Sequence, residues 1–504
     1  MANAQKTYEL LVKRLKELGV LDSVGAVLGW DERTQLPEKG AEARAEQMSL
    51  IARLRHEMFT SAEIGNWLGE IEGSDLVKDR ESDAAVNVRE TRHSYDRAAK
   101  LPSSLVEELT KMEVLAQHAW VEARKGNNYA AFEPWLAKTL ELKRQQADCY
   151  GGGAKRYDQL LEDFEPGETA TNLQRVFAEL RQELVPLVGA IAQSGKEAPA
   201  EILERKYPAA QQEKLAKIAA KAVGFDFAGG RLDVSVHPFS TGIAPGDARI
   251  TTRYDENYFG DAFFGTLHEA GHSMYSQGLP AEHFGTPRGE DISLGIHESQ
   301  SRMWENLVGR SRSFWEYFLP IAKEHFPEVL KDVSLEQWYF AVNDVKPSLI
   351  RTESDEATYN LHVMVRFELE QALLSGDLPT KDLPAAWNGK MTEYLGVDVP
   401  DDARGCLQDI HWSGGAIGYF PTYTLGNLYA AQFFEQAKKD VGNLDGQFAR
   451  GEFAGLLGWL REKIHSQGKK YRATELVNRV TGKPLSAEAL MRHLKKKAGE
   501  LYGV

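Results

Sequence analysis

The residues best suited to chemistry form a short pattern near the middle of the chain, Thr266-Leu-His-Glu-Ala-Gly-His-Ser-Met-Tyr275. His268 and His272 are four residues apart, so on a helix both imidazoles project from one face, as two ligands of one tetrahedral Zn²⁺ require. Glu269 can reach a water beside the metal as a general base. Aromatic and aliphatic neighbours indicate a buried helix, where two unpaired imidazoles would be costly. The pattern therefore predicts a catalytic metal site.

A catalytic zinc ion needs a third protein ligand and one open position. Residues 278–293 are rich in Gly and Pro and are typical of a loop, after which Ser293 is placed to cap a helix over about 294–310. A helix is a more rigid platform for a ligand than a loop, which favours Glu298 or Glu305, and the position of Glu298 near the helix start makes it the preferred one. The other candidates near the motif are Glu282, Glu290, Asp291, His283 and His297.

A second group of polar residues lies in the glycine-rich segment from Gly405 to Gly426. Peptide hydrolysis creates a tetrahedral oxyanion that needs preorganised hydrogen-bond donors, and a His or Tyr from another segment would serve. The segment contains Gln408, Asp409, His411, Trp412, Tyr419 and Tyr423. A helix junction lined by core aromatic residues is an equally good interpretation of these residues alone.

Two arginines could bind the terminus of a peptide substrate. A carboxypeptidase needs a cation for the substrate carboxylate, and Arg suits it because it can bind through two N–H groups. Arg351 in Ile350-Arg-Thr-Glu-Ser-Asp355 and Arg249 in Asp247-Ala-Arg-Ile-Thr251 are the candidates. Taken singly, each is better explained as a structural ion pair with a neighbouring acid.

Helical periodicity dominates the chain that must position these residues. Apolar residues repeat at helical spacing from Tyr8 to Leu18, and Gly19 is typical of a helix end. Residues 231–256 instead alternate polar with β-branched residues around Gly and Pro, which predicts short antiparallel strands just before the metal motif. Further helices are predicted near 41–58, 103–125, 129–148, 170–193, 210–223 and, with short breaks, over 428–501.

Composition narrows the classes of protein. The 504 residues, 42% of them hydrophobic, can bury a large core, and about three domains would be usual for this length. The net charge of −14 argues against nucleic acid or an anionic membrane as the partner. Two distant cysteines, Cys149 and Cys406, exclude a disulfide framework. We find neither a signal peptide nor an apolar stretch long enough to span a bilayer, so the cytoplasm is the expected location.

Together, these motifs resemble the Taq-type metallocarboxypeptidases, a family of cytosolic zinc peptidases. The resemblance spans nearly the whole chain and has one small departure, Ser354 where the family has Ala. The matching motifs, in order, are Trp30-Asp31, Arg44-Ala-Glu-Gln47, His237-Pro-Phe239, Asp247-Ala-Arg-Ile-Thr251, His268-Glu-Ala-Gly-His272, His297-Glu-Ser-Gln300, Ile350-Arg-Thr-Glu-Ser-Asp355, Gly405-Cys-Leu-Gln-Asp-Ile-His-Trp412 and Gly418-Tyr-Phe-Pro-Thr-Tyr423.

The resemblance implies a mainly α, saddle-like peptidase fold with a deep central groove, a small antiparallel sheet beside the metal, and a homodimer. It implies that His268, His272 and Glu298 bind one Zn²⁺ per chain and that Glu269 is the catalytic base. It also implies release of C-terminal amino acids with broad specificity and poor acceptance of proline. The remaining implied roles are oxyanion stabilisation by His411 and Tyr423 or Tyr419, and substrate carboxylate binding by Arg351.

Alternatives remain at this stage. An oligo-endopeptidase would use the same chemistry on internal bonds, and a silent peptide-binding protein would keep the groove without an intact site. Co²⁺ or Mn²⁺ would also suit two histidines and one carboxylate. Because the motifs from 237 to 423 must converge on one metal and no linker separates them, we expect residues 1–504 to form a single catalytic domain, divisible at most into two helical lobes beside the groove.

Overall fold

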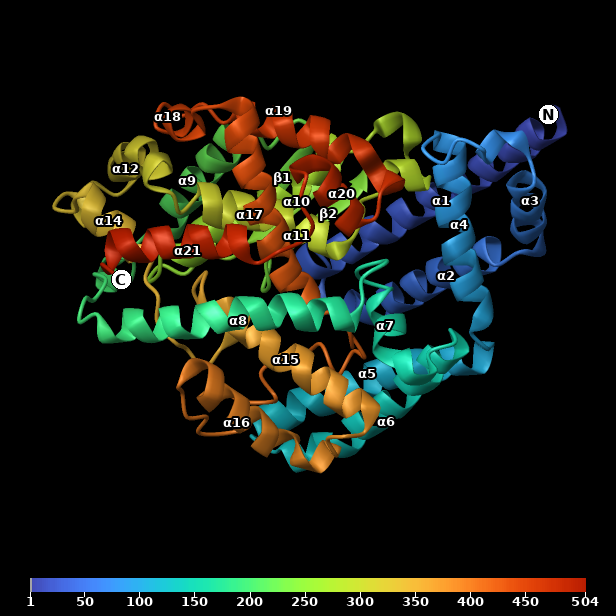
Figure 1. Cartoon of the computed structure of the whole chain (residues 1–504), viewed down its shortest axis with the longest axis horizontal. Coiled ribbons are helices and arrows are strands. Elements are labelled where there is room, and N and C mark those ends of the chain that lie inside the picture. The colour runs from blue at the N-terminus through green and yellow to red at the C-terminus, as the bar shows by residue number, and fades with distance from the viewer. Residues whose placement is uncertain (1) are drawn as a thin grey trace.

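A computed structural model of the protein describes residues 2–504, and most of them are helical (Figure 1). The first half contains α1 (Ala2–Thr34), α2 (Ala41–Phe59), α3 (Ala62–Glu72), α4 (Asp83–Lys100), α5 (Ser103–Lys125), α6 (Tyr129–Cys149), α7 (Arg156–Leu161), α8 (Ala170–Gln193) and α9 (Ala209–Val223). After the sheet come α10 (Gly260–Gly278), α11 (Leu294–Arg302), α12 (Arg312–His325), α13 (Pro327–Leu330), α14 (Leu335–Ala341), α15 (Thr358–Ser375), α16 (Leu383–Leu395), α17 (Pro421–Val441), α18 (Leu444–Phe448), α19 (Ala454–Lys463), α20 (Ala473–Thr481) and α21 (Glu488–Leu501). The mainly α class is confirmed.

The helix bounds agree closely with the hydrophobic periodicity. The predictions for 103–125 and 170–193 match both ends of α5 and α8, and those for α2, α6 and α9 are within one residue at each end. The helix that Ser293 was predicted to cap begins as expected, since the Ser293 hydroxyl accepts the Ile296 N–H. It ends earlier than 310, however, because α11 passes at Met303 into a π-helical turn that runs to Val308.

The predicted helix end at Gly19 is wrong. α1 continues through this position to Thr34. A Cβ on Gly19 would lie 2.5 Å from the Cα atom of Gly285, so the missing side chain allows α1 to touch the loop after α10. Gly19 therefore allows two backbone segments to lie close together and does not end the helix.

The small sheet before the metal motif contains β1 (Gly230–Val234), β2 (Ser240–Ala244) and β3 (Asp247–Thr252), in the order β1-β3-β2. The strands are confirmed, and β2 pairs antiparallel with β3. The expectation of an all-antiparallel sheet is wrong, because β1 pairs parallel with β3. Ser235 follows β1 and its N–H donates to Thr252 O at the end of β3, so the chain crosses that end before entering β2. Alternation reports which residues face the core but not which strands are neighbours.

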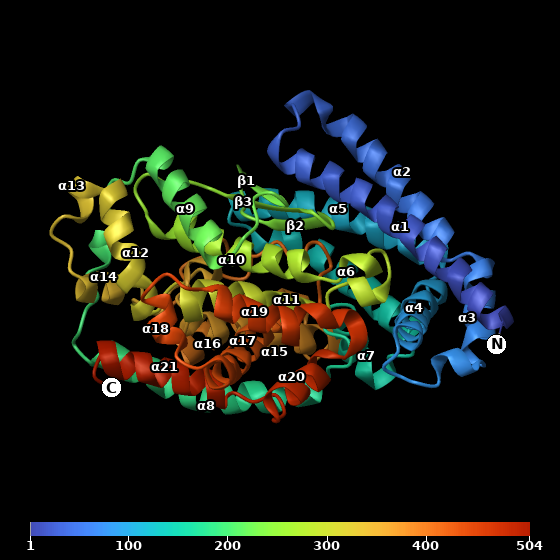
Figure 2. The same cartoon turned by 90° about the horizontal axis from the view of Figure 1, so that it is seen from above.

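Two hydrophobic clusters organise the helices. The larger cluster extends from Ala116 in α5 to Tyr502 beyond α21. The smaller one belongs to α1–α4 and consists of Leu11, Leu15, Leu18, Phe59, Ile64, Leu68, Ile71 and Val88. Seen from above, α1 and α2 form a long pair beside the sheet, with α3 and α4 at its outer end (Figure 2).

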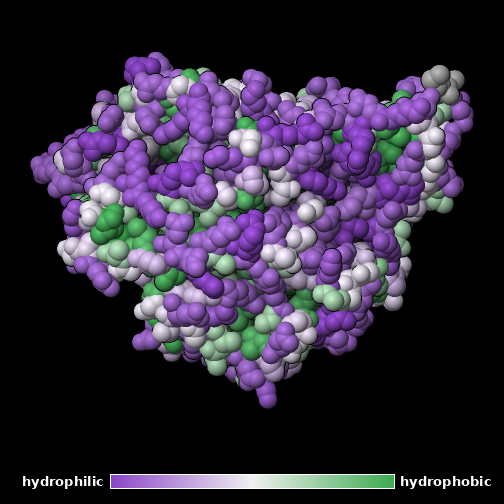
Figure 3. All heavy atoms as spheres, in the orientation of Figure 1, coloured by the Kyte–Doolittle hydropathy of each residue, from purple (hydrophilic) through white to green (hydrophobic). Residues whose placement is uncertain are grey.

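Helices α10, α11 and α17 pack together near the middle of the molecule, with α8 and α21 running across the face seen in Figure 1. That face is largely hydrophilic, with scattered apolar patches (Figure 3). Within residues 2–504, no helix combines the length and apolarity needed to cross a bilayer. Cys149 and Cys406 are both free, as expected.

Candidate metal centre

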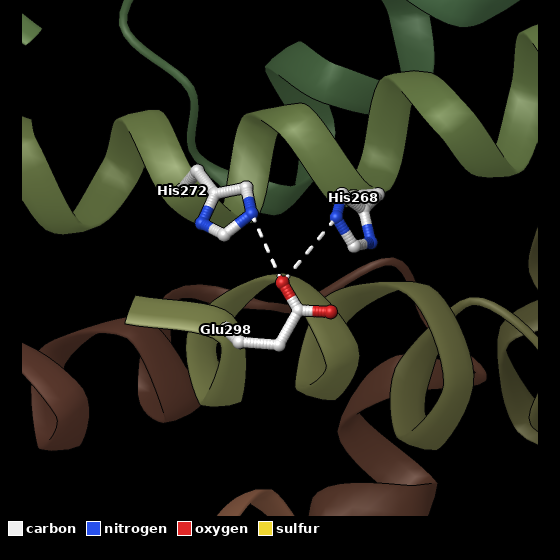
Figure 4. Close-up of side chains that lie close together, drawn as sticks. All are labelled: His268, His272 and Glu298. Carbon is white, nitrogen blue, oxygen red and sulfur yellow. Dashed lines mark ion pairs between the residues drawn. The ribbon is translucent and has the colours of Figure 1, made fainter. Parts of the chain in front are cut away.

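Three ligand atoms converge between α10 and α11. His268 and His272 project from α10 toward Glu298 of α11 (Figure 4). Oε2 of Glu298 lies 3.3 Å from Nε2 of His272 and 3.7 Å from Nε2 of His268. Ligand atoms on one tetrahedral Zn²⁺, each at about 2.0–2.1 Å, lie about 3.3 Å apart. The three donors, which lie within 4.8 Å of one another, therefore fit one divalent ion.

Two glycines allow the helices to approach so closely. A Cβ on Gly271, inside the histidine motif, would lie 2.6 Å from the Gln300 carbonyl oxygen on α11. A Cβ on Gly426 of α17 would lie 2.4 Å from Cγ of Glu298. α11 is thus held between two helices that present bare backbone to it, and Glu298 cannot retreat from the histidines.

The far nitrogens of both histidines are also engaged. Nδ1 of His268 lies 2.8 Å from Oε2 of Glu305, and Nδ1 of His272 lies 2.5 Å from Nδ1 of His297. Burial lowers the pKa of His297 to about 4, so its ring is neutral. Its Nδ1 can therefore accept a hydrogen bond from the Nδ1–H of His272. Such partners fix the tautomer that leaves Nε2 free for a metal. Glu305 and His297, both sequence candidates for ligands, instead occupy these orienting positions.

Arg302 ties the acidic groups together. Its Nε donates to Oε1 of Glu298 at 2.7 Å, and its Nη1 donates to Oε2 of Glu305 at 3.3 Å. Although burial opposes ionisation, Arg302 and the histidines hold the pKa of Glu298 well below its ordinary value. In the same way Arg302 and His268 lower the pKa of Glu305 to about 2 against the effect of burial. Both carboxylates are therefore charged at neutral pH.

Glu269 lies beside the converging donors and is 7% exposed. Burial, reinforced by the charges of Glu298 and Glu305, raises its pKa to about 7. Within residues 2–504 its carboxylate accepts no hydrogen bond from another side chain, which leaves it available to a water or substrate.

His411 and the two tyrosines of the glycine-rich segment lie together. Nε2 of His411 lies 3.1 Å from the Tyr423 hydroxyl, and the rings of Tyr419 and Tyr423 are 5.4 Å apart. Burial is the main cause of the raised pKa of both tyrosines, and the charge of Glu298 adds to it, so both lie in the electrostatic field of the candidate metal site.

Arg351 is 5% exposed and pairs with a distant acid, not with a neighbour in sequence. Its Nη2 lies 2.8 Å from Oδ1 of Asp409, while Nη2 of Arg366 lies 2.6 Å from Oδ2 of the same carboxylate. Two guanidinium groups thus share one carboxylate, leaving a net positive charge. Arg351 also donates to the Tyr359 hydroxyl, and the guanidinium of Arg302 lies 4.2 Å from the centroid of the Tyr359 ring. Two hydrogen bonds and this cation–π contact therefore connect Arg351, through Tyr359 and Arg302, to Glu298.

Arg249 has a different environment. Its Nε and Nη2 donate to both oxygens of Asp247, at 2.8 and 2.7 Å. Its guanidinium lies 4.5 Å from the ring centroid of Trp30 in α1. These contacts correspond to the structural ion pair that the sequence left open for Arg249.

The other candidate ligands lie in contacts of their own. Glu290 pairs with Lys469, His283 lies 3.5 Å from Asp83, and the Glu282 carbonyl accepts a hydrogen bond from a lysine of α1. The structure brings none of these three to the two histidines.

Comparison with known proteins gives the family. The family model described as carboxypeptidase Taq (M32) metallopeptidase matches residues 10–498 of the chain. The chain belongs to this family. It is 50% identical to thermostable carboxypeptidase 1 of Thermus thermophilus, with 99% of each chain covered, and 37% identical to carboxypeptidase 1 of Bacillus subtilis, with 97% of each covered. The solved M32 carboxypeptidase of Deinococcus radiodurans R1 is 42% identical, with a TM-score of 0.96 over 99% of this chain and 100% of that one.

Membership of the M32 family confirms the resemblance that the separated motifs suggested, and it makes the chain a peptide hydrolase of the metallocarboxypeptidase class. The sequence analysis did not single out two residues that contact the candidate site residues Glu298 and Arg351. Arg302 and Tyr359 were missed although their partners are near in sequence: Arg302 donates to Glu298 four residues before it, and Tyr359 accepts from Arg351 eight residues before it. The only available signal for Arg302 was its position four residues after Glu298, where helical neighbours meet.

Proposed function

We propose that the chain is a zinc-dependent carboxypeptidase that releases C-terminal amino acids with broad specificity and accepts C-terminal proline poorly. The observation that carries this proposal is the convergence of His268, His272 and Glu298 beside Glu269. When bound, a divalent ion supplies a Lewis acid that polarises the scissile carbonyl and acidifies the attacking water. Zn²⁺ suits the two imidazoles and one carboxylate, and Co²⁺ or Mn²⁺ are alternatives with the same donors.

The remaining steps belong to protein groups. Glu269 takes the proton of the attacking water and delivers it to the leaving amine. His411 and Tyr423, with Tyr419 beside them, donate hydrogen bonds to the developing oxyanion. Arg351 holds the substrate carboxylate, supported by the net positive charge that it shares with Arg366 and Asp409. Arg249 is the second candidate for the carboxylate, although its contacts with Asp247 and Trp30 favour a structural role.

Two peptides that differ only at the C-terminus test the reaction class. We expect the free acid to be shortened stepwise and its C-terminal amide to be cut at least tenfold more slowly, because charged hydrogen bonds of about 1.5–3 kcal/mol would be lost. Product analysis by mass spectrometry distinguishes the outcomes. Equal cleavage of both peptides at internal bonds would support the oligo-endopeptidase alternative.

Arginine variants then assign the carboxylate site. Arg351→Gln is expected to lower kcat/KM on the free acid about tenfold to a hundredfold and to reduce the preference over the amide. Arg249→Gln, matched in chemistry, should retain that preference. The ratio of the two peptide rates is the readout, because a general loss of folded enzyme lowers both rates equally. A preference that survives in Arg351→Gln and disappears in Arg249→Gln reverses the assignment.

We further propose that the chain forms a homodimer. α1 carries apolar side chains on two faces, and one row, Val20, Val24 and Val27, is 38–56% exposed. Light scattering should give about twice the mass of one 56.3 kDa chain. Val24→Asp is expected to give monomers. Val114→Asp, which changes an exposed valine of α5 instead of α1, should not. Dimers that persist in Val24→Asp would place the interface elsewhere.

We also propose that residues 1–504 act as one catalytic domain in the cytoplasm, with peptides as partners and no binding of nucleic acid or membranes. The large cluster that joins α5 to the C-terminal helices supports one unit, and the separate α1–α4 cluster is consistent with at most two helical lobes beside the groove.

A further inference from the structure

Glu165 is a buried carboxylate that the mechanism above does not use. It lies in the segment Asp163-Phe-Glu-Pro-Gly167 between α7 and α8 and is 0% exposed. Buried carboxylates are usually paired with a cation. Within residues 2–504, no Lys, Arg or His lies within ion-pair distance of this one. It accepts three hydrogen bonds instead, from Oγ of Ser293 at 2.9 Å, N–H of Gly295 at 2.9 Å and the Tyr429 hydroxyl at 3.0 Å.

Two of those three donors form the beginning of α11. Ser293 is the N-cap and Gly295 is in the first turn, where backbone N–H groups lack partners within the helix. The positive end of the helix dipole favours an anion at this place. The preceding residue adds a third connection, since Phe164 O accepts the Leu294 N–H at 3.1 Å. The α7–α8 segment therefore binds the first turn of α11 at three successive residues, and Glu298 follows on the next turn.

The fit between Glu165 and α11 leaves little room. A Cβ on Gly295 would lie 2.5 Å from Oε2 of Glu165 and 2.9 Å from the ring of Tyr429. The far end of α11 is irregular, because the π-helical turn begins at Met303. Hydrogen bonds within α11 do not set where this nine-residue helix lies against its neighbours. Its position comes from packing between α10 and α17 and from the polar contacts at its N-terminus, which hold it along its axis.

A second buried carboxylate gives a matched comparison. Glu370 of α15 is also 0% exposed and also accepts three hydrogen bonds, from Nε1 of Trp412, the Tyr157 hydroxyl and N–H of Gly418. Its partners hold the segment that carries His411, not the metal ligands. Burial raises the pKa of both Glu165 and Glu370 to about 7, so the two sites resemble each other electrostatically as well.

We propose that Glu165 is a positioning residue for the metal centre: by holding the N-terminus of α11, it sets the place of Glu298 opposite the two histidines. The proposal rests on the proposed metal site. Glu370 has the corresponding task for the oxyanion side of the active site. Each half of the site is thus fixed by one buried carboxylate, and in the part of the chain that the structure describes neither carboxylate forms an ion pair.

The test measures Zn²⁺ affinity of the full chain by competition with a chromophoric chelator. Glu165→Gln keeps the size of the side chain but turns one acceptor into a donor that faces other donors, so we expect the affinity to fall about tenfold to a hundredfold. Glu370→Gln should leave the affinity within about threefold of the wild type and lower kcat instead. Tyr429→Phe removes the donor that does not belong to α11, so it should change thermal stability more than affinity.

The outcomes distinguish failure of the positioning role from failure of the metal site. Wild-type affinity in folded Glu165→Gln overturns the positioning role, and an equal loss in Glu370→Gln shows that any buried defect has the same effect, which also overturns it. If Glu165→Gln does not fold, Ser293→Ala decides, with a severalfold loss of affinity expected and wild-type affinity contradicting the proposal. His268→Ala is the reference: unchanged affinity there refutes the metal site itself, whereas lost affinity there together with wild-type affinity in Glu165→Gln refutes only the positioning role.

Discussion

Glu269→Gln is expected to lower kcat by a factor of about 100 to 10,000 while the protein still binds one Zn²⁺ per chain. The amide has nearly the size of the carboxylate but cannot take the proton of the attacking water. None of the three converging donors is changed, so metal content should stay stoichiometric. Steady-state kinetics and elemental analysis on the same preparation provide the two readouts.

Asp261→Asn is the control for this loss, because it makes the same kind of change on the same helix. Asp261 pairs with Arg253 near the beginning of α10, and its substitution should leave kcat within about twofold. A Glu269→Gln enzyme with near-normal turnover would remove Glu269 from the mechanism. Loss of metal from that variant would instead make Glu269 part of the binding site.

Gly426→Ala should damage the metal centre from the opposite side, without altering any polar group. The new methyl group would lie 2.4 Å from Cγ and 2.6 Å from Cβ of Glu298, a distance that packed carbon atoms do not reach. Either α17 or Glu298 must move, at a cost of about 1–3 kcal/mol in stability. We expect a lower melting temperature and at least a tenfold weaker Zn²⁺ affinity, measured by calorimetry and chelator competition.

Gly389→Ala in α16 is the matched substitution, since a Cβ there meets no atom within 4 Å. Alanine is the better helix former, so this variant should be more stable than the wild type by about 0.5–1 kcal/mol. The two glycine variants are therefore expected to change stability in opposite directions. A stabilised Gly426→Ala with unchanged Zn²⁺ affinity would contradict the close packing of α17 against Glu298.

The fold could be predicted where the relevant forces are local. Amphipathic periodicity depends on residues three and four apart, and it gave the bounds of α5 and α8 to the residue. It failed at Gly19, where the reason for glycine is Gly285, far away in sequence. The parallel pairing of β1 with β3 was missed for the same reason, because alternation does not specify a neighbour.

The residues of the candidate site could likewise be predicted only where the signal is local in sequence. The histidine spacing predicted the two imidazoles that converge in the candidate metal site. The family resemblance selected Glu298, where position near the helix start could only favour it over Glu305. The contacts of Glu305 with His268 and of Arg351 with Asp409 join segments dozens of residues apart, so sequence alone left their roles open. Glu165 gave no signal at all, since its three donors come from α11 and α17.

The length of α1 has a mechanical consequence. At 1.5 Å per residue, its 33 residues form a continuous rod about 50 Å long. The first half of the rod belongs to the small N-terminal hydrophobic cluster, and Trp30 near its other end covers the guanidinium of Arg249 on the sheet. Any tilt of the N-terminal cluster as a rigid body must therefore shift Trp30 against Arg249. α1 thus connects the α1–α4 cluster mechanically to β3, the strand that leads into α10 and its two converging histidines.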